Sequence, residues 1–374
     1  MSSVEFGSTL VTGGCGFLGS YVVDALLKEP GCGPITVISR NPIKNLRDGV
    51  SYRPCDLNDL PKLEKLIQDV QPRTVFHTAS PVANDMTLQP REFLRTNIDG
   101  TNNLLTAAKK CAAVKALIYS STMAVIAGSP HVNVSEGMRY NTSPAECTPY
   151  NWSKTLAEQA VLAANSPDSS KEGVAGFVTT SLRLCLMYGV GDAQSIPGLL
   201  PSVCSGQTNM QLGDNSNLIE TVWVGTAADA HILAARALLD PGRSKERLAD
   251  PSMRVDGEAF NITDGNPVRF WDYVRLIYRA AGDKTQPKDI TVIPAWLAMI
   301  MAEIAEWAFW IGTLGRRRPT QLNKLVVIYC VRTYTYDISK ARRVLGFKPV
   351  PRLEEEIAKA VAAELEKQGK KPVS

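Results

Sequence analysis

The chain has few of the residues that build metal sites or disulfide frameworks. Among its 374 residues there are three histidines, far apart, and none of the eight cysteines belongs to a C-x-x-C pair. No block of lysine and arginine dominates any segment, and the formal net charge is only +4. The first residues lack the basic start and long apolar run of a secretory signal. We therefore expect no metal ion, no nucleic-acid partner and reduced cysteines, in a protein on the cytosolic side of the cell.

What the chain does contain is a regular alternation of strands and helices. Apolar runs predict strands, and apolar residues at helical spacing predict helices between them. The expected strands cover residues 8–12, 35–38, 74–77, 115–120, 178–184 and 259–263, and the expected helices cover 19–28, 61–70, 93–110 and 150–165. Strands that are apolar on both faces and alternate with helices are typical of a parallel sheet covered by helices on both sides.

A glycine-rich turn follows the first expected strand. Gly14, Gly16 and Gly19 form G-x-G-x-x-G, with Gly13 directly before them. These glycines permit a tight turn, close approach of the backbone to a pyrophosphate and close packing of the helix, whose N-terminus attracts phosphates. The sequence therefore predicts an α/β fold, a Rossmann-type doubly wound parallel sheet that binds NAD or NADP, with a smaller C-terminal substrate lobe.

The alternation loosens after about residue 190, where prolines and glycines interrupt the pattern. We assign residues 1–190 to the dinucleotide-binding domain, with elements that return to it near 218–237 and 257–265. Residues 191–374 are expected to form mainly the substrate-binding lobe.

The end of the second expected strand bears on the choice of cofactor. It carries Ser39 and Arg40, and no carboxylate that would accept hydrogen bonds from a ribose 2′-hydroxyl. A hydroxyl and a cation suit a 2′-phosphate, which favours NADP over NAD and leaves NAD open. Asp56 and Leu57, just past a third strand, are candidates to contact the adenine. The alternative, which the sequence supports equally, is that Asp56 is an ordinary residue at the start of a loop.

A second motif suits proton transfer. Tyr150 and Lys154 form Y-x-x-x-K at the start of an expected helix, where a spacing of four places both side chains on one face. An ammonium group beside a tyrosine, together with an oxidised nicotinamide, favours the phenolate, so we expect a lowered pKa for Tyr150. The hydroxyl group of Ser121 or Thr122 follows a parallel strand and should open into the same crevice. Such a hydroxyl can hold the substrate oxygen as its proton leaves.

These motifs resemble the extended short-chain dehydrogenase/reductase superfamily over nearly the whole chain. The 3β-hydroxysteroid dehydrogenase branch is the nearest resemblance, through the stretches TGGCGFLGS, VFHTASP (75–81), TNIDGTNNLL (96–105), LRLCLMYGVGD (182–192) and YDISKARRVLGFKP (336–349). GQTNMQLGDNSNL (206–218) and the apolar segment near 293–314 are most similar to fungal sterol-4α-carboxylate 3-dehydrogenases of the decarboxylating kind.

The resemblance implies roles for individual residues. Tyr150 would be the acid/base, Lys154 would bind the nicotinamide ribose, and Asn97 would support Lys154. It also assigns Phe17, Leu18 and Ala79 to the cofactor site beside the glycines, Ser39, Arg40, Asp56, Leu57 and Lys154.

The chain departs from the family pattern at three places. Thr122 stands where the family's catalytic serine is expected, so either Thr122 or its neighbour Ser121 could serve. Leu184 replaces a usual proline, and Ser39-Arg40 stands where the sterol-4α-carboxylate enzymes often carry an acidic residue.

The apolar segment 293–314 bears three tryptophans and precedes a basic run. Its length approaches membrane thickness, but Glu303 and Glu306 would be costly in hydrocarbon, which disfavours a spanning helix. Two interpretations stay open. One is a core or subunit-interface helix. The other is a helix that lies on a membrane surface, with contact through 293–318 and a peripheral location at the endoplasmic reticulum. The superfamily's paired-helix homodimer would use the helices at 93–110 and 150–165.

The expected activity is NAD(P)-dependent oxidation of a 3β-hydroxyl on a sterol or triterpenoid, with loss of a 4α-carboxylate as CO2. Ser39 and Arg40 keep open an NADPH-dependent ketone reductase of fungal natural-product biosynthesis. A nucleotide-sugar epimerase or dehydratase is disfavoured, because the second lobe is rich in Ile, Leu, Met and Trp rather than in groups for a diphosphate. A non-catalytic dinucleotide-binding sensor is the alternative of another class, and it would not need Tyr150 and Lys154.

Overall fold

The computed structural model describes residues 4–83, 88–167, 176–240, 250–313 and 322–370. Its centre is a parallel sheet of seven strands in the order β12-β7-β5-β4-β1-β2-β3. The strands are β1 (Gly7–Thr12), β2 (Cys32–Ser39), β3 (Val50–Pro54), β4 (Thr74–His77), β5 (Ala116–Thr122), β7 (Val178–Leu184) and β12 (Ala259–Ile262). Each expected strand is present, and β3 ends just before Asp56 as the sequence implied.

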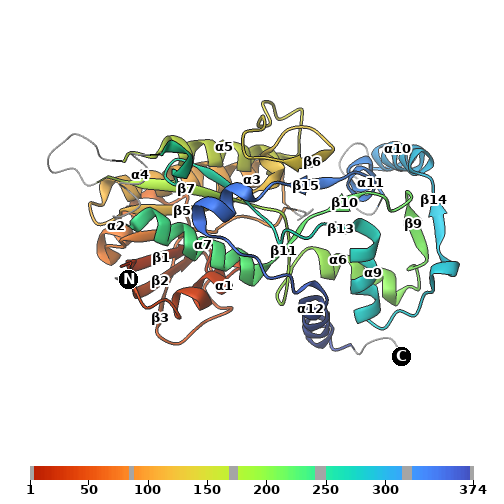
Figure 1. The fold of residues 1–374 in the computed structure, drawn as a ribbon, viewed down its shortest axis with the longest axis horizontal. Coiled ribbons are helices and arrows are strands. Elements are labelled where there is room, and N and C mark those ends of the chain that lie inside the picture. Colours follow the sequence, from red (N-terminus) through yellow and green to blue (C-terminus); the bar gives the residue numbers. More distant parts are fainter. Residues whose placement is uncertain (1–3, 84–87, 168–175, 241–249, 314–321, 371–374) are drawn as a thin grey trace.

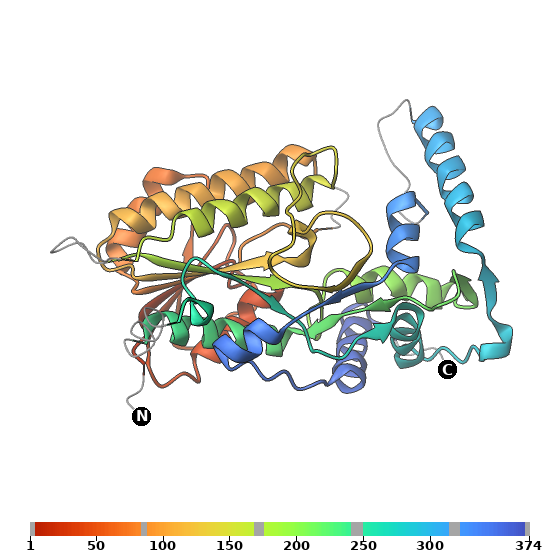
Figure 2. The ribbon, with the colours of Figure 1, turned by 45° about the horizontal axis from the view of Figure 1, so that its top comes forward.

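Helices cover both faces of this sheet (Figures 1 and 2). On one face α1 (Phe17–Leu26) packs against α7 (Val224–Leu239), and their apolar residues share a core with β1 and β2. On the other face lie α2 (Leu60–Val70), α4 (Gly100–Lys110) and α5 (Pro149–Ala163), with a separate core cluster. Burial on both sides explains the continuous apolar strands. The prediction of a doubly wound α/β sheet is confirmed.

The helix expected at 93–110 is interrupted. It consists of α3 (Pro90–Leu94), a π-helical turn at Arg95–Asp99, and α4. This single π-helical turn separates two regular α-helical segments. Such turns are frequent at functional sites. In this chain the turn contains the buried Asn97.

The smaller lobe lies at the carboxyl side of the sheet (Figure 1). It has its own buried core, to which α6 (Ser195–Cys204), α9 (Phe270–Ala280), α11 (Lys324–Val331) and α12 (Leu353–Lys367) contribute. Its short strands are β8 (Leu186–Tyr188), β9 (Met210–Leu212), β10 (Leu218–Ile219), β11 (Thr221–Trp223), β13 (Val268–Arg269), β14 (Thr291–Ile293) and β15 (Tyr334–Tyr336). β15 also pairs with β6 (His131–Val134), so this late strand contacts the N-terminal half of the chain.

Helix α10 (Ala295–Gly312) stands at the outer edge of the lobe beside α11 (Figure 2). Of its residues only Ala298 and Ala302 are buried. The core-helix interpretation is therefore wrong for the single chain. Within the described residues α10 is the one helix long and apolar enough to cross a membrane, which by itself is weak evidence for a span.

Candidate active site

The glycine turn leaves no room for side chains. A Cβ on Gly13, whose φ is +70°, would lie 2.7 Å from the Cα of Ala79, and one on Gly14 would lie 2.7 Å from a methyl group of Val37. At Gly19 a Cβ would lie 2.7 Å from the Cα of Gly14. Gly16 precedes α1, and no side chain caps that helix. Uncapped N–H groups behind a turn without side chains fit the pyrophosphate of a dinucleotide.

The side chains of Phe17 and Leu18 differ in position. Leu18 is buried in the core behind the turn. Phe17 is partly buried, edge-on to Tyr21, and a Cβ on Gly191 would touch its ring. Phe17 therefore lies between the glycine turn and the start of the smaller lobe.

A buried histidine contacts Thr12, the residue directly before the glycine turn. Thr12 Oγ1 lies 2.7 Å from His77 Nδ1 and accepts a hydrogen bond from the backbone of Ala79, while His77 Nε2 lies 2.9 Å from Thr101 Oγ1. Burial lowers the pKa of His77 to about 3, with the nearby Lys154 acting in the same direction, so the ring is neutral. Sequence reasoning considered His77 only as a metal ligand. The stretch VFHTASP was the available signal for this role.

The end of the site that we expect to hold the adenine carries more charge than the sequence suggested. Arg40 is exposed at the end of β2, and Ser39 beside it is partly exposed. Burial acts to raise the pKa of Asp56, but hydrogen bonds from Asn58, together with Arg95 and Arg40, lower it. A guanidinium nitrogen of Arg95 lies 3.6 Å from the Asp56 carboxylate. Sequence reasoning missed Arg95, because the π-helical turn brings it to this end of the site.

Leu57 has a structural position. Its side chain is buried in the core beneath α4, and its carbonyl accepts a hydrogen bond from Asn103 at 2.9 Å. Of the two residues, Asp56 therefore offers a polar side chain at this edge and Leu57 does not.

Tyr150 and Lys154 project from the first turns of α5. Thr148 caps the helix through Asn151, and Pro149 occupies its first position. Lys154 is 2% exposed, donates a hydrogen bond of 2.6 Å to the carbonyl of Ser120, and has its Nζ 4.3 Å from the ring centroid of Tyr119. Both contacts suit an ammonium group.

In the protein alone, burial is the largest influence on the ionisation of this pair. Burial raises the pKa of Tyr150 to about 12, although the hydroxyls of Ser80 and Thr122 act to lower it. Burial lowers the pKa of Lys154 to about 7, and Glu158 acts in the opposite direction. The lowering that we expect with an oxidised nicotinamide in place is not seen in the protein alone, where burial outweighs the effect of the two hydroxyls.

The three hydroxyls at the end of β5 go to three different places. Ser120 Oγ lies 2.7 Å from His231 Nε2, on the side of α7. Ser121 is buried on the side of α5. It makes no hydrogen bond of normal length within the described chain, yet it is close enough to Glu158 to lower that group's pKa. Thr122 accepts a hydrogen bond from Ala124 and contacts the Tyr150 hydroxyl.

Asn97 reaches α5 indirectly. Its Nδ2 donates to Ser153 Oγ at 2.9 Å, and Ser153 Oγ donates to the carbonyl of Tyr150 at 2.8 Å. Its Oδ1 is buried and has no hydrogen-bond partner among the described residues. Asn97 therefore holds the turn that carries Tyr150 and Lys154, and keeps one acceptor unused.

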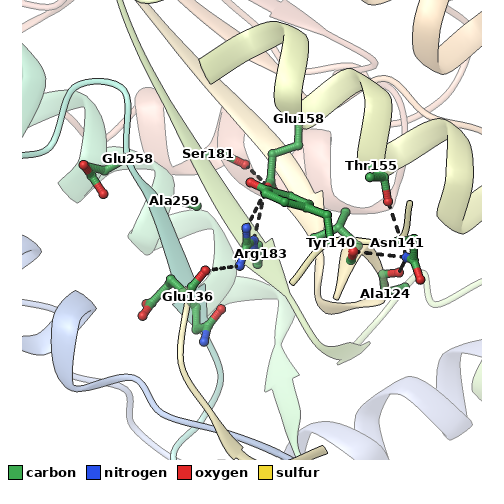
Figure 3. A network of polar contacts seen from close by, with 12 residues as sticks. Ala124, Glu136, Tyr140, Asn141, Thr155, Glu158, Ser181, Arg183, Glu258 and Ala259 are labelled. Carbon is green, nitrogen blue, oxygen red and sulfur yellow. Dashed lines mark hydrogen bonds and ion pairs between the residues drawn. The ribbon is translucent and has the colours of Figure 1, made fainter. Parts of the chain in front are cut away.

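A buried polar network continues from Lys154 along α5 (Figure 3). Glu158 accepts two hydrogen bonds from Arg183, at 2.9 and 2.7 Å, one from Tyr140 at 2.7 Å and one from Ser181 at 2.9 Å. The adjacent Asn141 donates to the carbonyls of Ala124 and Val125 and to Thr155. The network thus joins α5, β7 and the turn after Thr122. Sequence reasoning missed all of these residues, and the position of Glu158 four residues after Lys154 was the signal.

An apolar wall borders Thr122. Residues Met123, Val125, Ile126, Val134 and Tyr336 form a buried cluster, with Tyr140, Cys185 and Tyr334 packed against it. Thr122 is in register with Leu184 of the neighbouring strand. This buried apolar cluster thus begins at the residue that directly follows Thr122.

Comparison with known proteins agrees with this geometry. The model of the 3-beta hydroxysteroid dehydrogenase/isomerase family matches residues 10–293. Sterol-4-alpha-carboxylate 3-dehydrogenase ERG26, decarboxylating, of Gibberella zeae is 34% identical over 77% of this chain and 90% of its own length. The Saccharomyces cerevisiae enzyme of the same name is 32% identical over 97% and 98%.

Solved structures share the fold. The Bordetella bronchiseptica enzyme WbmH in complex with NAD+ has a TM-score of 0.68 at 19% identity, covering 96% of this chain and 98% of its own. UDP-glucose 4-epimerase of Thermotoga maritima has a TM-score of 0.68 at 22% identity, covering 96% and 99%. The chain belongs to the 3-beta hydroxysteroid dehydrogenase/isomerase family and is an NAD(P)-dependent oxidoreductase of the extended short-chain dehydrogenase type.

Proposed function

We propose that the protein oxidises the 3β-hydroxyl of a 4α-carboxylated sterol or a related triterpenoid and releases the carboxylate as CO2. The observation that carries this proposal is the contact of the Tyr150 hydroxyl with Thr122, beside Lys154 and an apolar wall. The 32% identity to the yeast sterol-4-alpha-carboxylate 3-dehydrogenase, over 97% of this chain, supports the same substrate class.

The chain's own residues account for the proton transfer. The glycine turn, Phe17 and Ala79 would hold the dinucleotide, and its nicotinamide would accept the hydride from C3. Thr122 and Tyr150 orient the 3β-hydroxyl by hydrogen bonds. Tyr150 as phenolate removes the hydroxyl proton, and the ammonium group of Lys154 stabilises the phenolate. Ser121 faces Glu158, which makes Thr122 the better candidate for the catalytic hydroxyl.

The same hydroxyls serve the second step. Oxidation at C3 gives a β-keto acid, in which the bond between C4 and the carboxylate breaks and its electron pair forms an enolate with the C3 oxygen. Protonated Tyr150 and Thr122 already face that oxygen and can donate hydrogen bonds to the charge that develops there. A proton then replaces CO2 at C4.

The test is an assay with a 3β-hydroxy-4α-carboxy sterol, run with NAD and NADP in parallel and analysed by mass spectrometry. We expect a 3-ketone that has lost CO2. A protein that binds dinucleotide but forms no such ketone with either cofactor would overturn the substrate assignment, while leaving the fold and the cofactor site intact.

Arg40 and Arg95 support NADP as the preferred cofactor, because two cations near the end of β2 suit a 2′-phosphate. We expect Arg40→Ala to raise KM for NADP by about 10-fold, the loss of one charge-assisted hydrogen bond, and to leave KM for NAD nearly unchanged. Lys44→Ala, which removes a cation in the following loop, is the control. Equal effects of Arg40→Ala on both cofactors would contradict this role.

Arg40 and Arg95 also support a second candidate function, the reduction of a ketone by NADPH. A chain that prefers NADPH and reduces a terpenoid or phenolic ketone would use Tyr150 as the proton donor in the reverse direction. The parallel assay separates the two functions, since a reductase would consume NADPH with a ketone and release no CO2.

We further propose that α10 lies on a membrane surface that supplies the sterol. Trp296, Trp307 and Trp310 are 66%, 60% and 56% exposed. The acidic side chains of the helix face α11, where Glu303 pairs with Lys324 at 2.9 Å and Glu306 accepts from the backbone of Lys324. The outward face is thus left apolar. The basic run Arg316–Arg318 that the sequence places beside it lies outside the described residues.

Vesicle flotation tests this surface. We expect the full chain to float with vesicles of endoplasmic-reticulum lipids, and the triple variant of Trp296, Trp307 and Trp310 to serine to stay in the soluble fraction, because each buried tryptophan contributes a few kcal/mol to partition. Ile43→Ser with Val132→Ser, which changes exposed apolar residues elsewhere, is the control. A wild-type protein that stays in the soluble fraction would refute the proposal.

Three related assignments remain proposals. A homodimer would pair α4 and α5, whose outward residues Asn102, Thr106 and Gln159 are exposed, and the mass in solution by light scattering tests it. The location would be the cytosolic side of the endoplasmic reticulum. Residues 1–190 would bind the dinucleotide and 191–374 the substrate, which the return of β12 to the sheet and the separate core of the lobe support.

A further inference from the structure

We propose that Glu158 is the counter-charge that holds Lys154 in its ammonium form, so that the buried Glu158–Arg183 pair is a positioning device of the proton-transfer site. This inference rests on the function proposed above. It gives the buried hydrogen-bond network around Glu158 a role in proton transfer, in addition to its role in stabilising the fold.

The first argument is the placement along α5. Tyr150, Lys154 and Glu158 follow one another at intervals of four, and the three side chains therefore occupy one face of the helix. Successive members are separated by about 6 Å along the helix axis. Lys154 and Glu158 are 2% and 0% exposed, so little water lies between them to screen their charges.

The second argument is that Glu158 is an anion. Glu158 is the acceptor in all four of its hydrogen bonds in the network, two from the guanidinium of Arg183 and one each from Tyr140 and Ser181 (Figure 3). Burial acts to raise the pKa of Glu158, but the charge and hydrogen bonds of Arg183 outweigh it, and the pKa is lowered. The acid is therefore ionised across the physiological range.

The third argument is that Lys154 has no other negatively charged partner within the described parts of the chain. Its direct contacts are the carbonyl of Ser120 and the ring of Tyr119, neither of which carries a formal charge. Burial raises the pKa of the Tyr119 hydroxyl well above its usual range, so that phenol is neutral too. His77, the other titratable group nearby, is neutral and would repel Lys154 if it were protonated. Glu158 is the charge that opposes the cost of burying the ammonium group.

The consequence concerns the alkaline side of the pH profile. The pKa of Lys154 is about 7, so its charge, and with it the stabilised phenolate, is lost as the pH rises through that value. Removing the charge of Glu158 lowers the pKa of Lys154 further. The alkaline decline of kcat/KM then moves to lower pH, by about one unit or more.

The experiment uses a double variant, because Glu158→Gln alone would leave the guanidinium of Arg183 buried without a partner and could prevent folding. Glu158→Gln combined with Arg183→Met removes both charges. If the pair were only structural, a folded double variant would keep the wild-type pH profile. We expect instead that the alkaline decline shifts to lower pH, with KM for the dinucleotide changed less than about threefold.

The control is a second ion pair, which lies just before β12 and is more exposed than the first. Lys340 Nζ lies 2.7 Å from Glu258 Oε2, and neither residue contacts Lys154. Glu258→Gln combined with Lys340→Met removes the same two charges, and we expect it to leave the pH profile unchanged. An equal shift in this control would show a general effect of net charge and would overturn the proposal.

A second readout does not depend on the substrate. With carbon-13-labelled lysine, the side-chain resonance of Lys154 is identified by its absence from Lys154→Met, and its titration is followed by nuclear magnetic resonance in the full chain. We expect the midpoint in the Glu158→Gln/Arg183→Met variant to lie below that of the wild type, by less than loss of Glu158 alone would give, because the positive charge of Arg183 is removed with it. An unchanged midpoint overturns the inference even if the sterol assay succeeds. A shifted midpoint without sterol turnover refutes only the proposed function.

Discussion

Replacement of Tyr150 by phenylalanine is expected to reduce kcat by about 10²- to 10⁴-fold, the usual contribution of a positioned acid or base. The variant keeps the ring that packs edge-on against Phe93, with centroids 6.0 Å apart, and loses only the hydroxyl that contacts Thr122 and Ser80. The free energy of unfolding should therefore change little. KM for the dinucleotide should stay close to the wild-type value, because the glycine turn is untouched. Steady-state kinetics and calorimetric titration of the dinucleotide check both parts.

Tyr21→Phe is the matched control for this variant. The Tyr21 hydroxyl donates a hydrogen bond of 3.2 Å to the carbonyl of Val190, which is not one of the proton-transfer residues. We expect full activity from this control. Turnover of Tyr150→Phe at the wild-type rate would refute the assignment of Tyr150 as the acid/base and would reopen the sensor alternative.

Replacement of Gly19 by alanine is expected to be the most damaging single change to cofactor binding. The added methyl group would meet backbone atoms of Gly13 and Gly14, which cannot rotate away as a side chain can. Overpacking of this kind costs about 1–3 kcal/mol. If this cost falls on the conformation that receives the pyrophosphate, affinity drops about 10- to 100-fold. Calorimetric titration of NAD and NADP measures the loss.

The control is Gly198→Ala. Gly198 lies in α6, and a Cβ there would have no atom within 4 Å. Because alanine favours a helix interior over glycine by about 1 kcal/mol, this variant should be slightly more stable and bind dinucleotide normally. Normal binding by Gly19→Ala would mean that the dinucleotide does not lie across this turn.

The sequence was sufficient for the sheet and for the motif residues, for physical reasons. Strands buried on both faces must be apolar throughout, and a turn against a pyrophosphate must lack side chains. Both requirements leave local traces, as at Gly13–Gly19 and in the runs that became β1 and β4. The face shared by Tyr150 and Lys154 follows from helix geometry alone.

The partners of those residues could not be found in this way. Arg183 stands in a strand whose other residues are apolar or small, and its acceptors Glu158 and Glu136 are 25 and 47 positions away. Nothing local distinguishes such an arginine from one at a surface. Likewise the π-helical turn that brings Arg95 toward Asp56 is one extra residue of backbone per turn, which the apolar periodicity of 93–110 does not reveal.

The pairing of β15 with β6 has a consequence for the order in which the molecule forms. Tyr336 lies 3.1 Å from His131 and Tyr334 lies 2.8 Å from Ser129, and each contact joins residues 205 positions apart. Contacts of such separation close a long loop and tend to form late in folding. Tyr336 also belongs to the apolar wall beside Thr122. During synthesis the glycine turn can therefore be complete while this wall is still missing, so a chain stopped before residue 334 would carry the turn without the complete apolar wall after Thr122.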